Sequence, residues 1–174
     1  MPAVLRMGLL TVSDRSASGQ RPDLGGPALQ ERILEQGWKI VRQAIIPDNY
    51  PAIVSTLQSW ADSGDVDIIL TTGGTGFSRR DVTPEATLAV IQRQAPGLAE
   101  AMRQASLQVT PHAMLSRSVA GIRGQTLIVN LPGSPKGALE NLAVILPVLS
   151  HAVQLLQEDT AAEAGHTYSA PHSE

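Results

Sequence analysis

Short apolar runs alternate with helical patterns along the first half of the chain. The runs cover residues 4–12, 38–46 and 66–70. Runs of this kind, rich in Val, Ile and Leu and bounded by glycines or polar residues, are typical of strands covered on both faces. Between them, apolar residues recur at helical spacing over 27–37 and 51–64. The pattern therefore predicts two strand–helix units that lead into a third strand.

The second half is predicted to add a hairpin and further helices. Prolines that suit a first helical turn open the segments 84–92 and 96–107. Thr83 is expected to be the N-cap of the first of these helices. Turn residues at 123–125 then separate two short apolar runs and indicate a β-hairpin. Its strands are expected over 119–122 and 126–131.

A last helix is predicted over 139–156, where apolar residues recur every three or four positions. Pro147 lies within it and should kink it or divide it into two helices. The apolar surface is wider than one stripe, so part of it could serve a subunit contact. Residues 158–174 are small, polar and aperiodic, which predicts a flexible C-terminal tail. We therefore expect one domain over residues 1–157, followed by the tail.

Composition narrows the classes of function. The chain has 174 residues, enough for one α/β domain with a substantial core. With 13 Lys+Arg against 16 Asp+Glu its net charge is −3, which argues against a general binder of nucleic acid or of acidic membranes. There is no cysteine, so disulfides, thiolate nucleophiles and cysteine metal sites are excluded. The sequence has neither a signal-peptide pattern nor an uninterrupted apolar span of membrane length, and we expect a soluble cytoplasmic protein.

Polar residues and glycines follow four of the predicted strands. They are Ser13-Asp14-Arg15 after the first, Asp48 after the second, 73–81 after the third and 130–136 after the last. Parallel sheets bind ligands beyond the carboxyl ends of their strands, so these four segments are expected to meet at one edge. Together they would bring carboxylates, cations and two glycine-bearing loops to that edge. The combination favours a phosphorylated ligand with a divalent metal, because Mg²⁺ is usually held by one or two carboxylates plus substrate phosphates.

The loop Thr71-Thr72-Gly73-Gly74-Thr75-Gly76 leads from the third strand towards the helix that begins near Pro84. Backbone N–H groups at a helix N-terminus carry partial positive charge, and glycines let a phosphate approach without a Cβ in the way. The loop lacks the Gly-Lys-Ser/Thr ending of a P-loop, and the third glycine of the dinucleotide-binding fingerprint is missing. The sequence thus predicts a phosphate loop of a different kind.

Three segments carry a resemblance to a known family. They are the glycine loop with the following Arg79-Arg80-Asp81-Val82-Thr83-Pro84-Glu85-Ala86, Ser13-Asp14-Arg15 upstream, and Leu131-Pro132-Gly133-Ser134-Pro135-Lys136 downstream. In this order they resemble the molybdopterin-binding family, which includes molybdopterin adenylyltransferase (MogA), molybdenum cofactor biosynthesis protein B (MoaB) and the G domain of gephyrin. The resemblance covers about residues 4–156. It implies a three-layer α/β/α domain with a mostly parallel, mixed sheet that has one antiparallel strand. It also implies a homotrimer, molybdenum cofactor biosynthesis, and transient contact with other cofactor-synthesis proteins.

The resemblance also implies a reaction and the residues that carry it. The family's adenylyltransferases join molybdopterin to ATP in the presence of Mg²⁺ and release pyrophosphate. Asp48 and Asp81 match the family's two functionally important aspartates, and we expect them to be catalytic and to hold the metal and the ATP phosphates. The other residues expected to bind nucleotide or molybdopterin are Ser13, Asp14, Gly73, Gly74, Thr75, Gly76, Ser116, Pro132, Gly133, Ser134 and Lys136. Arg79 and Arg80 are further candidate phosphate cations.

Ordinary structural roles compete with these assignments. Asp48 could make an Asx turn after Pro47, and Asp81 could be a second cap for the helix that follows it. The remaining polar candidates could be turn residues, a loop hydroxyl or solvated surface cations: Ser13, Asp14, Ser116, Lys136, Arg79 and Arg80. Two other classes of function also stay open. One is a MoaB-type paralogue that binds molybdopterin or nucleotide with little catalysis, and the other is a trimeric scaffold.

Overall fold

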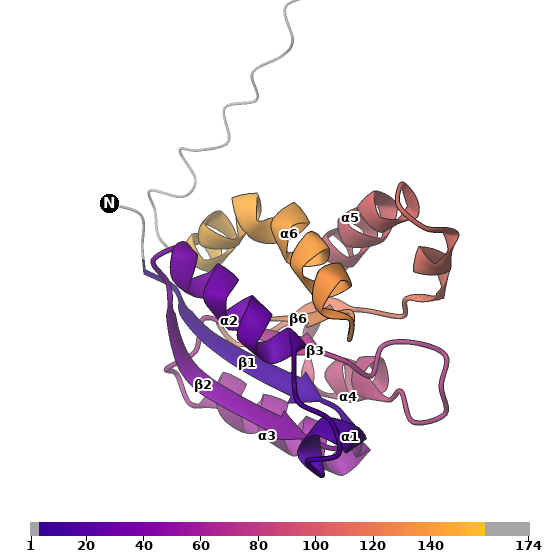
Figure 1. The fold of residues 1–174 in the computed structure, drawn as a ribbon. Helices are drawn as coiled ribbons and strands as arrows, with labels where there is room; N and C mark the ends of the chain where they lie inside the picture. Colours follow the sequence, from indigo (N-terminus) through magenta and orange to yellow (C-terminus); the bar gives the residue numbers. More distant parts are fainter. Residues whose placement is uncertain (1–3, 159–174) are drawn as a thin grey trace, which may run out of the picture.

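The computed structural model describes residues 4–158, which form a six-stranded sheet covered by helices on both faces (Figure 1). In spatial order the strands are β2 (Lys39–Ile46), β1 (Arg6–Val12), β3 (Ile68–Thr72), β6 (Thr126–Leu131), β5 (Ala120–Arg123) and β4 (Arg93–Gln94). Neighbours from β2 to β6 are parallel, whereas β5 is antiparallel to both β6 and β4. The predicted α/β class is therefore confirmed, including the one antiparallel strand. The predicted tail lies outside the described residues from residue 159 onward.

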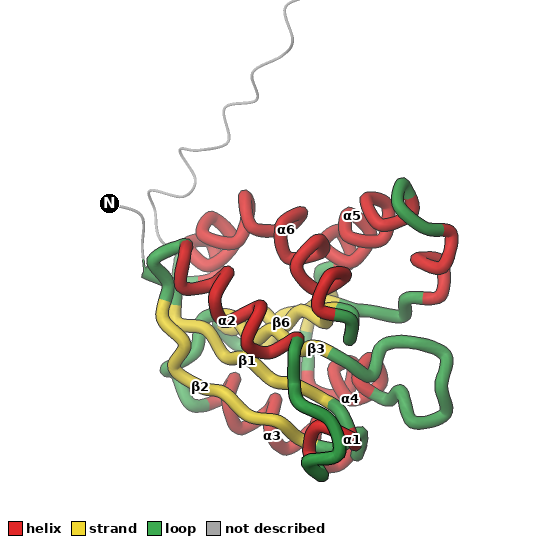
Figure 2. The backbone as a smooth tube through the Cα atoms, viewed as in Figure 1, coloured by secondary structure: helices red, strands yellow, loops and turns green. Residues whose placement is uncertain are grey.

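The helices form the two outer layers (Figure 2). Apolar residues of α2, α5 and α6 pack in one core on the sheet, and those of α3 and α4 pack in a second core on its other face. The helices are α1 (Asp14–Ala17), α2 (Gly25–Glu35), α3 (Tyr50–Asp62), α4 (Thr83–Val90), α5 (Pro96–Leu107), the 3₁₀ helix η1 (Pro111–Leu115) and α6 (Pro135–Leu156). This arrangement is the expected three-layer α/β/α domain.

Alternate side chains of the central strands serve the two cores. In β1, Leu9 belongs to the core beneath α2, α5 and α6, whereas Leu10 belongs to the core beneath α3 and α4. Ile68 and Ile69 of β3 divide in the same way, and every residue of β3 is buried. Because both faces of these strands are covered, their sequences are continuous apolar runs rather than alternating ones.

The pattern of apolar and polar residues did not predict three short elements, namely α1, β4 and η1. Each is held by local or tertiary hydrogen bonds rather than by an apolar period. The hydroxyl of Ser13 caps α1 by accepting from the N–H of Ser16 at 3.2 Å, and the hydroxyl of Thr110 accepts from the N–H of His112 at the start of η1. The two residues of β4 only pair with β5.

One expectation about the helices is wrong, and of the two alternatives expected at Pro147 the structure excludes division of the helix. Thr83 is not an N-cap but the first residue of α4, where Val82 takes the cap position without a side-chain bond. The buried hydroxyl of Thr83 donates instead to the carbonyl of Gly73 at 2.9 Å. Pro147 does not divide the last helix, because α6 runs as one element through it. Pro147 and Ala143, whose carbonyl loses its helical partner, are both exposed, so water can take the place of the missing N–H.

Within residues 4–158, α6 alone is long and apolar enough to cross a membrane by length and composition. One face of it is buried in the first core through Leu142, Leu149 and Val153. The helix also exposes Val148 and Leu155, which are 47% and 42% accessible. Its apolar composition thus reflects core packing on one side and uncovered surface on another.

Candidate active site

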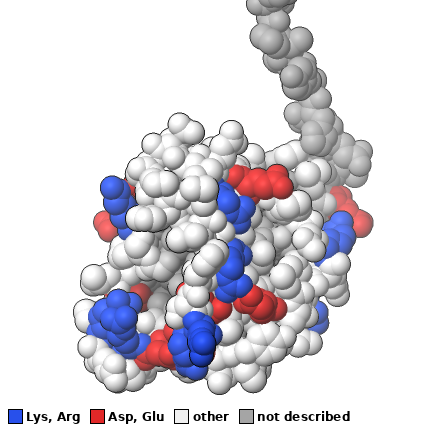
Figure 3. Space-filling view, turned by 90° about the vertical axis from the view of Figure 1, so that its right-hand side faces the viewer, with Lys and Arg blue, Asp and Glu red and all other residues white. Residues whose placement is uncertain are grey.

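The loops after β1, β2, β3 and β6 meet at one edge of the sheet and line a cavity of about 760 Å³. Among the lining residues are Ser13, Asp14, Asp48, Gly73, Gly74, Asp81, Gly133 and Ser134. The prediction that the four strand ends meet is therefore confirmed. On this side of the molecule, acidic side chains lie between groups of basic ones across the lower half of the face (Figure 3). The edge thus carries charges of both signs beside the cavity.

Asp14 and Asp48 hold the ends of β1 and β2 together. The N–H of Asp14 donates to Oδ2 of Asp48 at 2.9 Å, and the N–H of Asp48 donates to Oδ1 of Asp14 at 3.0 Å. Local capping belongs to the next residue, Asn49, whose side chain accepts from the N–H of Ala52 as the N-cap of α3. The carboxylate of Asp48 thus makes a long-range contact rather than the Asx turn that competed with its functional assignment.

Arg80 reaches from the glycine-rich loop to the first of these carboxylates. Its Nε and Nη2 contact Oδ2 and Oδ1 of Asp14, each at 2.9 Å. This hydrogen-bonded guanidinium holds the pKa of the Asp14 carboxyl below its ordinary value. Partial burial raises the pKa of Asp48, and the negative charges of Asp14 and Asp81 add to that rise. The cavity is lined by four aspartates and three arginines, namely Asp14, Asp23, Asp48, Asp81, Arg15, Arg21 and Arg80.

The glycine-rich loop after β3 requires its glycines. Gly73 and Gly74 adopt φ of +100° and +70°. A Cβ at Gly73 would lie 2.1 Å from a backbone oxygen of β1, and one at Gly74 would lie 2.3 Å from Oγ1 of Thr83. Among the described residues, the N–H groups of Gly74, Thr75 and Gly76 have no hydrogen-bond acceptor. Consecutive N–H groups of this kind are suited to an anion.

Asp81 closes the loop on itself. Its Oδ2 accepts from the N–H of Ser78 at 2.9 Å, so the carboxylate does not cap the following helix. A Cβ at Gly76 would lie 2.9 Å from the same oxygen. Glycine at this position therefore makes room for the carboxylate of Asp81 beside the loop.

A second cavity, of about 450 Å³, adjoins the first. The two cavities share the wall formed by Gly74, Asp81, Gly133 and Ser134. Beyond that wall the second cavity is lined by four more of the predicted site residues, namely Thr75, Gly76, Ser116 and Pro132. The predicted residues thus fall into two adjoining groups, and Asp81 lies between them.

Two candidate cations lie outside both cavities. Lys136 has a side chain that is 79% exposed, and its Nζ is 3.9 Å from Oε1 of Glu140. Arg79 is exposed and lines neither cavity. The structure does not bring these two residues together with the rest of the predicted site.

Sequence reasoning also misses residues that the structure brings to the two cavities. Arg21 and Asp23 line the larger one. The carboxylate of Asp23 accepts from the hydroxyl of Thr11 at 2.8 Å and from the N–H of Gly26 at 3.0 Å. An aspartate three residues before a helical N–H is a capping pattern, so this residue left a sequence signal. Arg103, which lines the smaller cavity from the middle of α5, left none.

Comparisons with known proteins agree with this geometry. The family described as "Probable molybdopterin binding domain" matches residues 8–151. Molybdopterin adenylyltransferase of Haemophilus influenzae is 48% identical over 145 residues, which is 82% of this chain and 73% of that protein. Its namesake in Escherichia coli K12 is 49% identical over 141 residues, or 79% and 72% of the two chains. The crystal structure of the molybdopterin biosynthesis enzyme MoaB from Thermus thermophilus is 49% identical, covers 90% of this chain and 98% of its own, and superposes with a TM-score of 0.84. The chain belongs to the molybdopterin-binding domain family.

Proposed function

We propose that this protein is a molybdopterin adenylyltransferase, which transfers AMP from ATP to molybdopterin. Relatives that carry this name are 41–49% identical to the chain, which supports the assignment. In the reaction, an oxygen of the terminal phosphate of molybdopterin attacks the α-phosphorus of ATP. The bond from the α-phosphorus to its bridging oxygen breaks, and pyrophosphate leaves. No other reactant is needed for the atoms to balance.

The observation that carries the proposal is the pair of adjoining cavities. A transfer between two substrates requires that their reacting atoms be held together in line. The larger cavity, with its carboxylates and Arg80, suits a triphosphate, and the smaller one suits the second substrate. The reacting phosphates would then meet at the shared wall, beside Asp81 and Gly74.

The chain's own groups would act mainly by positioning and by charge. The free N–H groups of the glycine-rich loop can donate to phosphate oxygens, and Arg80 can neutralise charge on them. Negative charge grows on the transferred group and on the leaving pyrophosphate, so donors fixed in place before the reaction lower its barrier. Because Arg80 is already bound to Asp14, a triphosphate in this cavity would compete with Asp14 for the guanidinium.

Asp48 and Asp81 would hold Mg²⁺. No group of three or more His, Asp or Glu side chains that could bind a metal occurs within residues 4–158. Two carboxylates completed by phosphates and water are, however, the usual ligands of Mg²⁺ in nucleotide sites. Burial raises the pKa of Asp48, the negative charges of Asp14 and Asp81 raise it further, and a bound cation would relieve that repulsion between carboxylates. When bound, Mg²⁺ would neutralise charge on the triphosphate and on the leaving pyrophosphate.

Turnover with the purified protein tests the proposal. Incubation with molybdopterin, ATP and Mg²⁺ should release pyrophosphate and yield an adenylylated pterin, detected by mass spectrometry. Leaving out molybdopterin should abolish pyrophosphate release. If ATP binds but no pterin is adenylylated, the adenylyltransferase assignment is wrong.

That outcome would favour a MoaB-type binding protein, the second candidate. The observation in its favour is the close superposition on the Thermus MoaB structure. Calorimetry would then detect molybdopterin or nucleotide binding without turnover.

The assembly expected for the active protein is a homotrimer. Exposed apolar side chains on α6, including Val148 and Leu155, support a subunit contact on that helix. Sedimentation velocity at micromolar concentration should give the mass of three chains, and a monomer would count against the contact.

A further inference from the structure

Arg117 connects the segment between η1 and β5 to the glycine-rich loop. Its Nε donates to the carbonyl of Gly76 at 2.8 Å, and its Nη2 donates to the carbonyl of Asp81 at 2.7 Å. Its own N–H donates to the carbonyl of Thr75 at 2.9 Å. The guanidinium also forms an ion pair with Glu85 of α4. One residue thus contacts both ends of the stretch 75–81 and the helix that follows it.

Two arginines hold the outer half of this loop: Arg80 pairs with Asp14, and Arg117 binds the backbone near Thr75 and Gly76. The inner half is fixed by Thr83, whose hydroxyl and N–H bind the carbonyls of Gly73 and Gly74. Among the described residues, only Arg117 donates to the carbonyls of Thr75 and Gly76. Arg80 thus fixes the tip of the loop to Asp14, whereas the carbonyls beside the smaller cavity are held by the backbone N–H and the guanidinium of Arg117.

The contacts of Arg117 also join the walls of the two cavities. Thr75 and Gly76 line the smaller cavity, and Asp81 lines both. Ser116, which precedes Arg117, lines the smaller cavity as well. Arg103 holds the backbone on both sides of Arg117, since it donates to the carbonyl of Ser116 at 3.1 Å and to that of Ser118 at 3.0 Å. The backbone of Arg117 is therefore held by Arg103, while its guanidinium binds the loop.

We infer that Arg117 is a positioning residue, which fixes the position of the glycine-rich loop and Asp81 relative to the segment that carries Ser116. Its role rests on the proposed adenylyl transfer, because that reaction requires ligands in the two cavities to meet at Asp81. Arg117 acts through backbone carbonyls and Glu85 and lines neither cavity.

The planar guanidinium is needed for this set of bonds. It directs separate N–H groups at two carbonyls and at a carboxylate, which a lysine ammonium on a flexible stem cannot reproduce in the same geometry. Burial alone would raise the pKa of the Glu85 carboxyl, but its hydrogen bond and charge interaction with Arg117 leave that pKa below the ordinary value. Glu85 thus stays ionised and keeps the guanidinium in place.

Arg123 provides a matched control. It also pairs with a carboxylate, that of Asp62 at 2.8 and 2.9 Å, and donates to one carbonyl, that of Val90 at 3.0 Å. None of these residues lines either cavity. Arg117→Met and Arg123→Met therefore remove similar sets of bonds, the first beside the two cavities and the second away from them. Arg117→Lys is a milder variant that retains a cation beside Glu85.

The test compares kcat, KM, melting temperature and hydrogen exchange of the amides in 74–82. We expect Arg117→Met to lower kcat about 100-fold, the size of effect seen when a catalytic group is misplaced by about 1 Å. It should also speed hydrogen exchange in 74–82, with Arg117→Lys between it and the wild type. Arg123→Met should lose a similar amount of thermal stability but keep the wild-type kcat and exchange in 74–82. Equal exchange in the two methionine variants, or an unchanged kcat in Arg117→Met, would overturn the inference. If the wild type itself does not turn over, the proposed function fails, and the exchange comparison still decides whether Arg117 positions the loop.

Discussion

Among single residues, Asp81 is the carboxylate that the two cavities share. Its Oδ2 accepts from the N–H of Ser78, and the amide oxygen of an asparagine could keep that bond. We therefore expect Asp81→Asn to lower kcat by about 100-fold or more, because the charge it removes would help to hold the Mg²⁺ that neutralises the reacting phosphates. The melting temperature should change little. A large fall in melting temperature with a normal rate would indicate a structural role for Asp81 instead.

Asp48 leads to a prediction about pH. Its pKa in the folded protein is raised, by partial burial first and then by the charges of Asp14 and Asp81. A group whose folded-state pKa is raised stabilises the fold at low pH, and this contribution is lost as pH rises through that pKa. In the variant Asp48→Asn this side chain cannot ionise. The melting temperature of the variant minus that of the wild type should therefore increase as the pH rises from about 3 to about 7.

Two controls accompany this titration. Asp62→Asn should show the opposite sign, because the hydrogen bond from Arg123 lowers the pKa of Asp62. Addition of Mg²⁺ at neutral pH should raise the melting temperature of the wild type more than that of Asp48→Asn, provided that Asp48 is a ligand. A difference between Asp48→Asn and the wild type that does not vary with pH would contradict the electrostatic account.

The sequence is informative about residues that follow strands and silent about those that act over long separations. Asp48 and Asp81 could be predicted because they stand at strand ends in a recognisable order. Arg117 could not, since its partners Gly76 and Glu85 lie 41 and 32 residues away and only the fold brings them together. Lys136 shows the converse, because it stands within a matching motif and yet its side chain faces solvent.

At the scale of elements, a buried hydroxyl helps to tie the end of β3 to the start of α4. Thr83 donates to the carbonyl of Gly73 at 2.9 Å, and Thr126 donates to the carbonyl of Val66 at 2.9 Å at the other edge of the sheet. Valine has nearly the same shape as threonine but lacks the donor. Thr83→Val and Thr126→Val should each lower the free energy of unfolding by about 1 kcal/mol, measured by urea denaturation.

Of these two variants, only Thr83→Val should weaken the binding of ATP. Without the hydroxyl bond, the start of the glycine-rich loop keeps the bond from the N–H of Thr83 to Gly74 but is held less firmly to α4, so we expect Thr83→Val to raise the KM for ATP. Thr126→Val should keep the wild-type KM. If both variants, or neither, change the KM for ATP, the loop is not held in this way.

Long elements with a clear apolar period were predictable, and short ones were not. The hairpin of β5 and β6 has strands that match the predicted segments within one residue, because each is an apolar run bounded by turn residues. By contrast α1 has four residues and β4 has two, which is too short for any period to show. Their existence depends on the Ser13 cap and on pairing with β5, and therefore on the surrounding fold.

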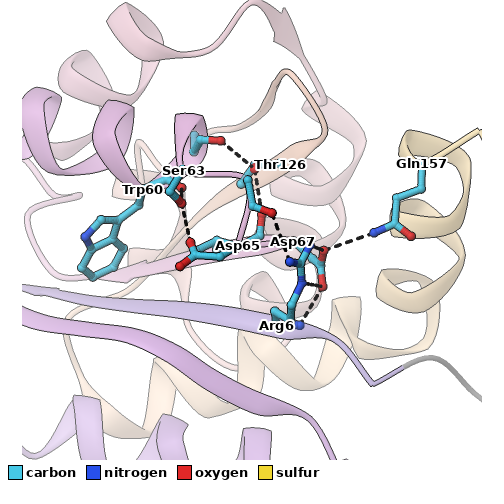
Figure 4. A network of polar contacts seen from close by, with 10 residues as sticks. Arg6, Trp60, Ser63, Asp65, Asp67, Thr126 and Gln157 are labelled. Carbon is cyan, nitrogen blue, oxygen red and sulfur yellow. Dashed lines mark hydrogen bonds and ion pairs between the residues drawn. The ribbon is translucent and has the colours of Figure 1, made fainter.

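At the scale of the whole molecule, the edge of the sheet that carries the candidate site lies opposite an edge that secures the fold. At the opposite edge Arg6 and Gln157 both contact Asp67 (Figure 4). Arg6 donates to the two carboxylate oxygens of Asp67 at 2.7 Å from Nη2 and from its backbone N–H. These contacts tie β1 and the residue after α6 to the start of β3, and the side chain of Asp67 is only 6% exposed.

Asp67→Asn should therefore lower the stability of the fold and leave kcat unchanged. Removal of a charged acceptor from this largely buried set of bonds should lower the free energy of unfolding by about 2 kcal/mol. Asp65→Asn is the control, because Asp65 pairs with Arg42 on the surface, where both side chains are more than 40% exposed. An exposed pair of this kind contributes about 0–1 kcal/mol. Urea denaturation followed by tryptophan fluorescence would measure both losses, and kcat would be compared at a temperature where each variant stays folded. An equal loss in the two variants would show that Asp67 does not anchor the edge. A reduced kcat in folded Asp67→Asn would show that the two edges of the sheet are energetically coupled and do not act independently.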